Sequence, residues 1–150
     1  MSTEKQKLGD RGEQLIRKNF NCFICKRTKT LKPLIANFKC ADLICDFCGY
    51  LAQVKTNNVD NVDIFPKQIL GAAWAPQKER MDAGIYFPIF FVLISKKNRN
   101  KFSISYLPAD LQNERMFIKR TPLKPTARRA GWQGYLLDGE AIKSKMIRLK

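Results

Sequence analysis

Three residues in one short segment of the sequence have side chains suited to metal-dependent hydrolysis. Asp42 supplies a carboxylate. Further along the chain come Gln53 and Lys55, which are two residues apart from each other. An acid at the end of a strand can ligate Mg²⁺, a hard cation that prefers oxygen, and a second oxygen on the neighbouring strand can complete the protein's ligands. A lysine on the same face can polarise a water or stabilise developing negative charge. Together these groups suit hydrolysis of a phosphodiester.

The pattern around these residues predicts that they meet across a hairpin. Residues 33–45 alternate as a strand does, with Asp42 on one face. Residues 50–56 form a second predicted strand, in which Gln53 and Lys55 share a face because side chains repeat every two residues. A Cys-x-x-Cys knuckle occupies the turn between the two strands, so the three side chains can converge.

Four of the five cysteines form two Cys-x-x-Cys pairs. Cys22 and Cys25 make the first pair, Cys45 and Cys48 the second, and nineteen residues separate them. Each pair offers two sulfurs from one tight turn, and two turns complete a tetrahedral, structural zinc site. Disulfides are the less favoured alternative in a cytosolic protein. Cys40 is predicted to be a small buried apolar residue.

The charge of the chain points to a polyanionic partner. There are 28 Lys and Arg residues against 13 Asp and Glu, a formal net charge of +15 over 150 residues. Residues 96–150 alone hold 14 basic and 4 acidic side chains. Nucleic acid is the usual partner of such a field, although a merely soluble basic surface would also produce it. The chain has no histidine, which excludes every mechanism that depends on an imidazole base or ligand.

The sequence has the features of one cytoplasmic domain. Hydrophobic residues make up 45% of the chain, enough for a core. No apolar run approaches the ~20 residues of a membrane span, and residues 85–95, the longest, are interrupted by Pro88. The charged start has no secretory signal. We therefore expect neither a membrane nor a small-molecule substrate as partner, and the sequence does not predict an oligomeric state.

The remaining elements predict an α+β fold with a central mixed sheet. We expect helices over 9–20 and, after Pro66, over 65–84. We expect strands over 88–95 and 101–108 joined by a turn at 96–101, a loop over 121–138 rich in Pro, Gly and Arg, and a short basic strand over 142–150.

The loop over 121–138 carries basic residues beside an aromatic. Lys124, Arg128 and Arg129 lie close in sequence to Trp132. Such a mixture suits contacts to DNA phosphates and to a groove. The alternative is that Trp132 anchors the core and the arginines are merely solvated.

The order of these motifs resembles that of the DpnI-type restriction endonucleases and dam-replacing proteins. Two Cys-x-x-Cys pairs, the string Ala-Asp-x-x-Cys-x-x-Cys followed by Gln-x-Lys, and "PLKPTARRAGW" carry the resemblance, which covers roughly 22–150. It implies a PD-(D/E)xK restriction-endonuclease-like core with a four-cysteine zinc site. It also implies a type II-like, Mg²⁺-dependent endonuclease acting on double-stranded DNA, with adenine-methylated GATC as the site that relatives cut.

The same resemblance assigns roles to residues. Asp42 would be the metal-binding acid, Lys55 the catalytic lysine, and the four paired cysteines would hold structural zinc. Gln53 stands where DpnI-type enzymes have glutamate, although Mrr-like nucleases of the same fold use glutamine. Glu13, on the first predicted helix, could add a metal ligand; a surface glutamate is the simpler interpretation.

The resemblance also bears on domain organisation. DpnI-type enzymes carry a C-terminal winged-helix reader domain. We expect residues 1–150 to be a nuclease domain with embedded zinc knuckles (20–50), without that reader. Two other functions are still open: a catalytically inactive, zinc-stabilised DNA-binding protein, and an RNA-binding or ribosome-linked zinc protein.

Overall fold

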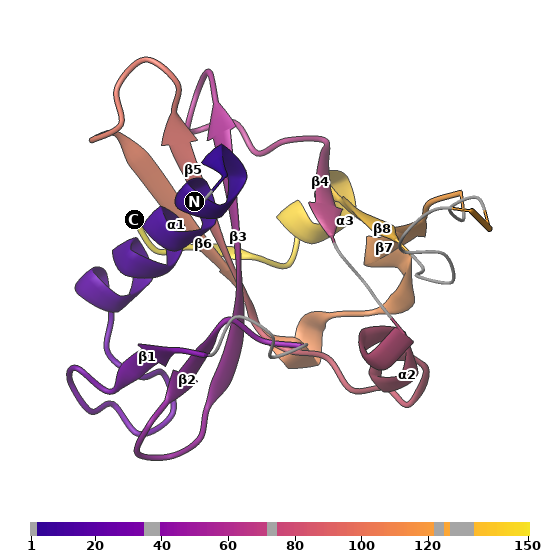
Figure 1. Ribbon diagram of the computed structural model, residues 1–150, viewed down its shortest axis with the longest axis horizontal. Coiled ribbons are helices and arrows are strands. Elements are labelled where there is room, and N and C mark those ends of the chain that lie inside the picture. Colours follow the sequence, from indigo (N-terminus) through magenta and orange to yellow (C-terminus); the bar gives the residue numbers. More distant parts are fainter. Residues whose placement is uncertain (1–2, 35–39, 72–74, 122–124, 127–133) are drawn as a thin grey trace.

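The computed structural model describes residues 3–34, 40–71, 75–121, 125–126 and 134–150. Within these ranges the chain forms an α+β structure (Figure 1). The helices are α1 (Glu4–Asn19), α2 (Ala75–Asp82) and α3 (Gly139–Lys143), with 3₁₀ turns η1 (Ala109–Leu111) and η2 (Glu114–Met116). The strands are β1 (Leu31–Pro33), β2 (Leu43–Cys45), β3 (Leu51–Val59), β4 (Gln68–Gly71), β5 (Ile89–Ser95), β6 (Phe102–Leu107), β7 (Phe117–Lys119), β8 (Tyr135–Asp138) and β9 (Ile147–Arg148).

Two sheets organise these strands. The larger has the order β1-β2-β3-β5-β6-β9, and the smaller has the order β4-β8-β7. β3 and β5 run parallel at the centre of the larger sheet, and its other neighbours are antiparallel. The sheet is therefore mixed and has helices beside it, which confirms the predicted fold class. Figure 1 shows α1 lying across this sheet, with α2, α3 and the smaller sheet to the other side of it.

β5 separates two hydrophobic cores because its side chains alternate between the two faces of the sheet. Phe90, Val92 and Ile94 pack with Leu15 and Ile16 of α1. On the opposite face, two other β5 residues pack against the smaller sheet and α3; that cluster contains Ile69, Ile89, Phe91, Leu107, Met116, Leu137 and Ile142. Every residue of β5 is buried, as expected for a central strand that is covered on both sides.

α1 is positioned by a capping box at its start and a glycine at its middle. The Thr3 hydroxyl accepts a hydrogen bond from the Gln6 N–H, and the Gln6 side chain accepts one from the Thr3 N–H. Gly12 is buried against β3, where a Cβ atom would lie 1.8 Å from Thr56 Oγ1. Only glycine lets the helix approach the strand this closely.

Four secondary-structure predictions are wrong in part. The single strand expected over 33–45 is not continuous, because β1 ends at Pro33 and β2 begins at Leu43, and the two strands pair antiparallel. Residues 68–71 are strand β4, not helix, and α2 begins only at Ala75. Residues 135–138, predicted as loop, are strand β8. The expected terminal strand over 142–150 starts instead within α3, and only Ile147 and Arg148 are extended in a sheet. In the part of the chain that the structure describes, no helix is long and apolar enough to cross a membrane.

Candidate active site and metal centre

The hairpin predicted to carry the site is present. β2 pairs antiparallel with β3, and Leu43 lies opposite Ala52. Asp42 extends this pairing by one residue, since its N–H donates to the Ala52 carbonyl over 2.9 Å. Asp42 therefore lies across from Gln53, where the ladder between the two strands ends.

The carboxylate of Asp42 is held by the backbone of β3. Its Oδ2 accepts a hydrogen bond of 2.8 Å from the Val54 N–H. That bond fixes the side chain over the strand segment that carries Gln53 and Lys55. A carboxylate oriented in this way needs little further ordering to bind a cation, because its rotamer is already selected.

Gln53 is almost fully buried, with 5% of its surface exposed. Its Nε2 donates to the Cys40 carbonyl over 2.8 Å. A carbonyl only accepts hydrogen bonds, so the amide nitrogen must face Cys40 and the amide oxygen must face away from it. Among the described residues that oxygen, Oε1, has no hydrogen-bond donor. Gln53 thus presents a neutral oxygen, beside Asp42, at a fixed place.

Lys55 is half-buried on the strand next to this pair. Burial lowers its pKa, Asp42 opposes the effect as a nearby negative charge, and Lys5 adds to it by repulsion. The electrostatic influence of Asp42 on Lys55 places the two groups in one neighbourhood. An amine with a lowered pKa is a candidate for proton transfer, since more of it is neutral at physiological pH.

Glu13 joins the group from α1, although the simpler interpretation of the sequence left it on the surface. It is half-buried, and its pKa is raised to about 7 by burial and by repulsion from Asp42 and Asp10, with Arg17 acting in the opposite direction. A half-buried carboxylate with a second acid nearby is a candidate ligand for a cation. The Glu-Gln-Leu-Ile sequence of the helix gives no sign of this, because the approach depends on how α1 crosses β3.

The four paired cysteines converge as predicted. Their sulfurs all lie within 4.8 Å of one another, with Cys22 and Cys48 3.5 Å apart and Cys25 and Cys45 3.7 Å apart. No other group of three or more cysteine or acidic ligands gathers among the described residues. Cys40 is buried outside the cluster, as the sequence predicts.

The surroundings favour the thiolate of Cys45, whereas at Cys48 a hydrogen bond from the Tyr50 N–H is outweighed by burial and by hydrogen bonding with the other three sulfurs, which raise the pKa of its thiol to about 11. Burial opposes ionisation of Cys45, but hydrogen bonding with the Cys48 N–H, the Thr30 side chain and the Phe47 N–H lowers the pKa of its thiol to about 6. The Cys48 nitrogen and the Thr30 oxygen lie 3.5 Å and 3.2 Å from the Cys45 sulfur. Thiolates are the form in which cysteines bind metal ions.

Four predicted DNA-contact residues cannot be placed. Lys124, Arg128, Arg129 and Trp132 lie outside the described residues. The prediction that they contact DNA is therefore still a prediction. The turn expected at 96–101 is present between β5 and β6.

This combination defines a class of protein: an α+β domain in which a four-cysteine cluster closes the hairpin that carries an acid, an amide and a lysine. A family model described as "DpnI: Dam-replacing family" matches residues 2–147. The match spans nearly the whole chain, and the chain belongs to the Dam-replacing family.

Proposed function

We propose that this protein is a Mg²⁺-dependent endodeoxyribonuclease of the PD-(D/E)xK type that restricts double-stranded DNA. The observation that carries the proposal is the position of Asp42, whose carboxylate is hydrogen-bonded to the Val54 N–H between Gln53 and Lys55 and whose charge acts on both Glu13 and Lys55. Family membership supports the same activity. Residues 1–150 would be one nuclease domain, with zinc knuckles at 20–50.

Three oxygen donors of the site suit a magnesium ion. Asp42 and Glu13 offer carboxylates and Gln53 offers Oε1, and Mg²⁺ usually keeps several waters beside a small number of protein ligands. Bound there, the ion would supply charge neutralisation for the scissile phosphate. Burial and repulsion from Asp42 raise the pKa of Glu13, and a divalent cation bound beside it would offset both effects.

Lys55 would act on the proton of the attacking water. Its lowered pKa increases the neutral fraction of the amine, and a neutral amine can accept a proton from water. The resulting ammonium would then stabilise charge on the phosphate oxygens. Asp42 would orient the water and Lys55 together, since it influences both.

We further propose that the cysteine cluster holds structural zinc. A tetrahedral ion with Zn–S bonds of about 2.3 Å requires sulfurs about 3.8 Å apart. The distances of 3.5 Å and 3.7 Å between opposite knuckles fit that requirement. Zinc would fix the end of the hairpin from which Asp42 and Gln53 extend.

DNA methylated at adenine in GATC is the proposed substrate, on the strength of the family. The basic residues Lys124, Arg128 and Arg129, with Trp132, would contact it. A cytoplasmic location, expected from the sequence, is likewise still a prediction.

A second candidate is a zinc-stabilised DNA-binding protein without cleavage activity. The observation that favours it is the bond from Gln53 to the Cys40 carbonyl, since a buried, hydrogen-bonded amide can be explained by structure alone. The two functions differ in magnesium affinity and in cleavage, not in zinc or DNA binding.

One experiment separates them. Zinc-loaded protein is incubated with plasmid DNA, adenine-methylated at GATC or unmethylated, in Mg²⁺ or Mn²⁺. Asp42→Asn and Lys55→Met variants serve as controls for contaminating nuclease. Fragments from methylated plasmid alone, lost in both variants, support the whole proposal. Cleavage of both plasmids would keep the chemistry and reject the methyl specificity, and no cleavage despite tight binding would favour the second candidate.

A further inference from the structure

The two cysteine knuckles expose an unusual set of side chains at their tips. Ile24 and Phe47 hold the same position in their knuckles, directly before the second cysteine, and are 66% and 61% exposed. Lys26, Arg27 and Lys29 follow the first knuckle and are exposed as well. We call these five residues the knuckle tip. Apolar side chains in solvent beside unpaired basic ones are typical of a surface with a partner.

Two of the lysines hold a backbone conformation that disfavours them. Lys26 has φ of 64° and Lys29 has φ of 59°, the left-handed region in which glycine is favoured. The second knuckle offers a direct comparison, because the residue after its second cysteine is Gly49, with φ of 81°. The same place in the first knuckle carries Lys26. A lysine in this conformation makes folding less favourable than a glycine would. Its presence therefore suggests that the side chain has a function.

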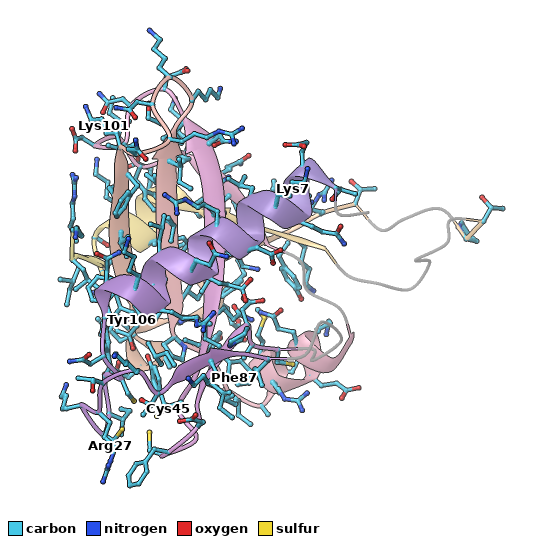
Figure 2. All side chains as sticks on the ribbon, turned by 60° about the vertical axis from the view of Figure 1, so that its left-hand side comes forward. Lys7, Arg27, Cys45, Phe87, Lys101 and Tyr106 are labelled. Carbon is cyan, nitrogen blue, oxygen red and sulfur yellow. The ribbon has the colours of Figure 1, made fainter. Side chains whose placement is uncertain are left out.

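Arg27 links the two knuckles. Its guanidinium lies 3.7 Å from the centre of the Phe47 ring. Figure 2 shows Arg27 projecting at the lower end of the molecule, beyond Cys45, far from Lys7 and Lys101 at the other end. This cation–π contact restricts the rotamers of Arg27, so the tip presents its guanidinium at a set position.

These basic groups are not explained by neutralisation of the metal site or of neighbouring acids. The Lys26 ammonium donates to the Phe23 carbonyl over 2.6 Å, and Arg27 stacks on Phe47, so neither has a recorded contact with a sulfur. None of the three makes an ion pair with a described residue. Asp46 is the one acid between Cys45 and Cys48.

We propose that the knuckle tip is a DNA-binding surface, in which Lys26, Arg27 and Lys29 contact backbone phosphates and Phe47 and Ile24 pack against the adjoining sugars. A cluster of exposed basic groups without ion-pair partners suits binding to the phosphates of a nucleic acid backbone. Most protein–DNA hydrogen bonds go to that backbone. The identification of DNA as the polyanion rests on the proposed function. The binding itself does not require cleavage.

Phe47 of the tip belongs to the same hairpin as Asp42. The Cys45–Cys48 knuckle forms the turn between β2 and β3, and Asp42 directly precedes β2. DNA bound at the tip would therefore approach the proposed site along this hairpin.

The test uses the Lys26→Gly/Lys29→Gly variant of the full chain. Glycine relieves the left-handed backbone while it removes the charge, so the variant is expected to keep its metal and to melt at the same temperature or higher. Binding to a fluorescent duplex is measured without Mg²⁺, from 50 to 200 mM salt. Loss of two phosphate contacts should make the slope of log K against log salt less steep by about 2. The ratio of the wild-type to the variant binding constant should therefore fall about tenfold from the lowest to the highest salt concentration.

Three further variants complete the design. Lys26→Arg/Lys29→Arg keeps the charge and the backbone cost, and is expected to bind as the wild type does. Lys143→Gln removes an exposed charge from α3 and should change the slope less. Phe47→Ala should weaken binding at all salt concentrations, because its contact is not ionic.

The outcomes are distinct. An unchanged affinity and salt slope in the glycine variant, with metal retained, would overturn the inference. Loss of metal or of folding in that variant would also overturn it, because the lysines would then serve the cluster. Altered binding to polyglutamate but not to DNA would reject DNA in favour of an acidic protein. If wild type binds DNA through the tip but does not cut methylated plasmid, the inference holds and the proposed function fails.

Discussion

The Asp42 carboxylate is bonded to the Val54 N–H at 2.8 Å, directly between the Gln53 and Lys55 positions of β3. The hydrogen bond means that the acid has two separable tasks, to hold the hairpin and to bind a cation. An asparagine can accept the same bond through its amide oxygen but carries no charge.

Asp42→Asn should therefore separate folding from activity. We expect the variant to unfold at nearly the wild-type denaturant concentration, while cleavage falls about 100-fold or more because a charged metal ligand is lost. Asp42→Ala, which also leaves the Val54 N–H without its acceptor, should lose both activity and about 1–3 kcal/mol of stability. Denaturant melts and plasmid cleavage, run on both variants, provide the check. If the Asp42→Asn and Asp42→Ala variants were equally stable, the hydrogen bond to the Val54 N–H would not contribute to folding.

Gln53→Glu should lower the stability of the metal-free protein and raise its affinity for Mg²⁺. The carboxylate adds a charge beside Asp42, which strengthens Mg²⁺ binding, but it removes the donor to the Cys40 carbonyl in a buried place. Without metal we expect the variant to melt below wild type, and with millimolar Mg²⁺ the difference should narrow. Thermal melts across a magnesium titration measure both effects. A variant that is as stable as wild type without metal would show that the amide bond contributes little.

Glu13 should make the stability of the metal-free protein depend on pH. Its pKa is near 4.5 when unfolded and about 7 when folded, so the folded chain holds the proton more tightly. The stabilising contribution is complete below pH 4.5 and is lost as pH rises through about 7. Glu13→Gln should therefore raise stability at pH 8 relative to wild type and change it little at pH 4. Urea melts at the two pH values test this. With Mg²⁺ added at pH 8, the wild type should become more stable than the Glu13→Gln variant.

Gly12→Ala should displace α1 from β3. The new methyl group would lie 1.8 Å from Thr56 Oγ1, so helix or strand must shift, at a cost of about 1–3 kcal/mol. Activity should fall further than stability, because Glu13 moves with the helix. Thr56→Ala in the same chain should recover part of both, and by itself it should cost little, since Oγ1 is buried without a hydrogen-bond partner in the described structure. Full activity in Gly12→Ala would contradict this account.

Local patterns in the sequence were sufficient for the hairpin, the knuckles and the strands at the centre of the sheet. The hairpin pattern anticipated that Asp42 lies against β3, where its carboxylate meets the Val54 N–H, and Cys-x-x-Cys spacing anticipated the cluster of four sulfurs. These features depend on residues close in the chain, so a local period reveals them.

The two missed strands have one cause. β4 was taken for helix and β8 for loop, and each pairs with the other, Ile69 lying opposite Leu137. Neither segment has an alternating pattern of its own strong enough to indicate a strand, and only their long-range pairing extends them. For the same reason the sequence could not decide between the two interpretations of Glu13, because its distance from Asp42 depends on how α1 crosses β3.

The parallel pairing of β3 with β5 has a consequence for how the chain folds. Gln53 lies beside Ile89 and Lys55 beside Phe91, so this half of the site is braced by a contact between distant segments. Closing such a long loop slows folding, whereas β2 and β3 follow one another in sequence and pair across a short turn. The β2–β3 hairpin can therefore form before β5 docks, and the segment that carries Gln53 and Lys55 becomes rigid only when β5 joins the sheet.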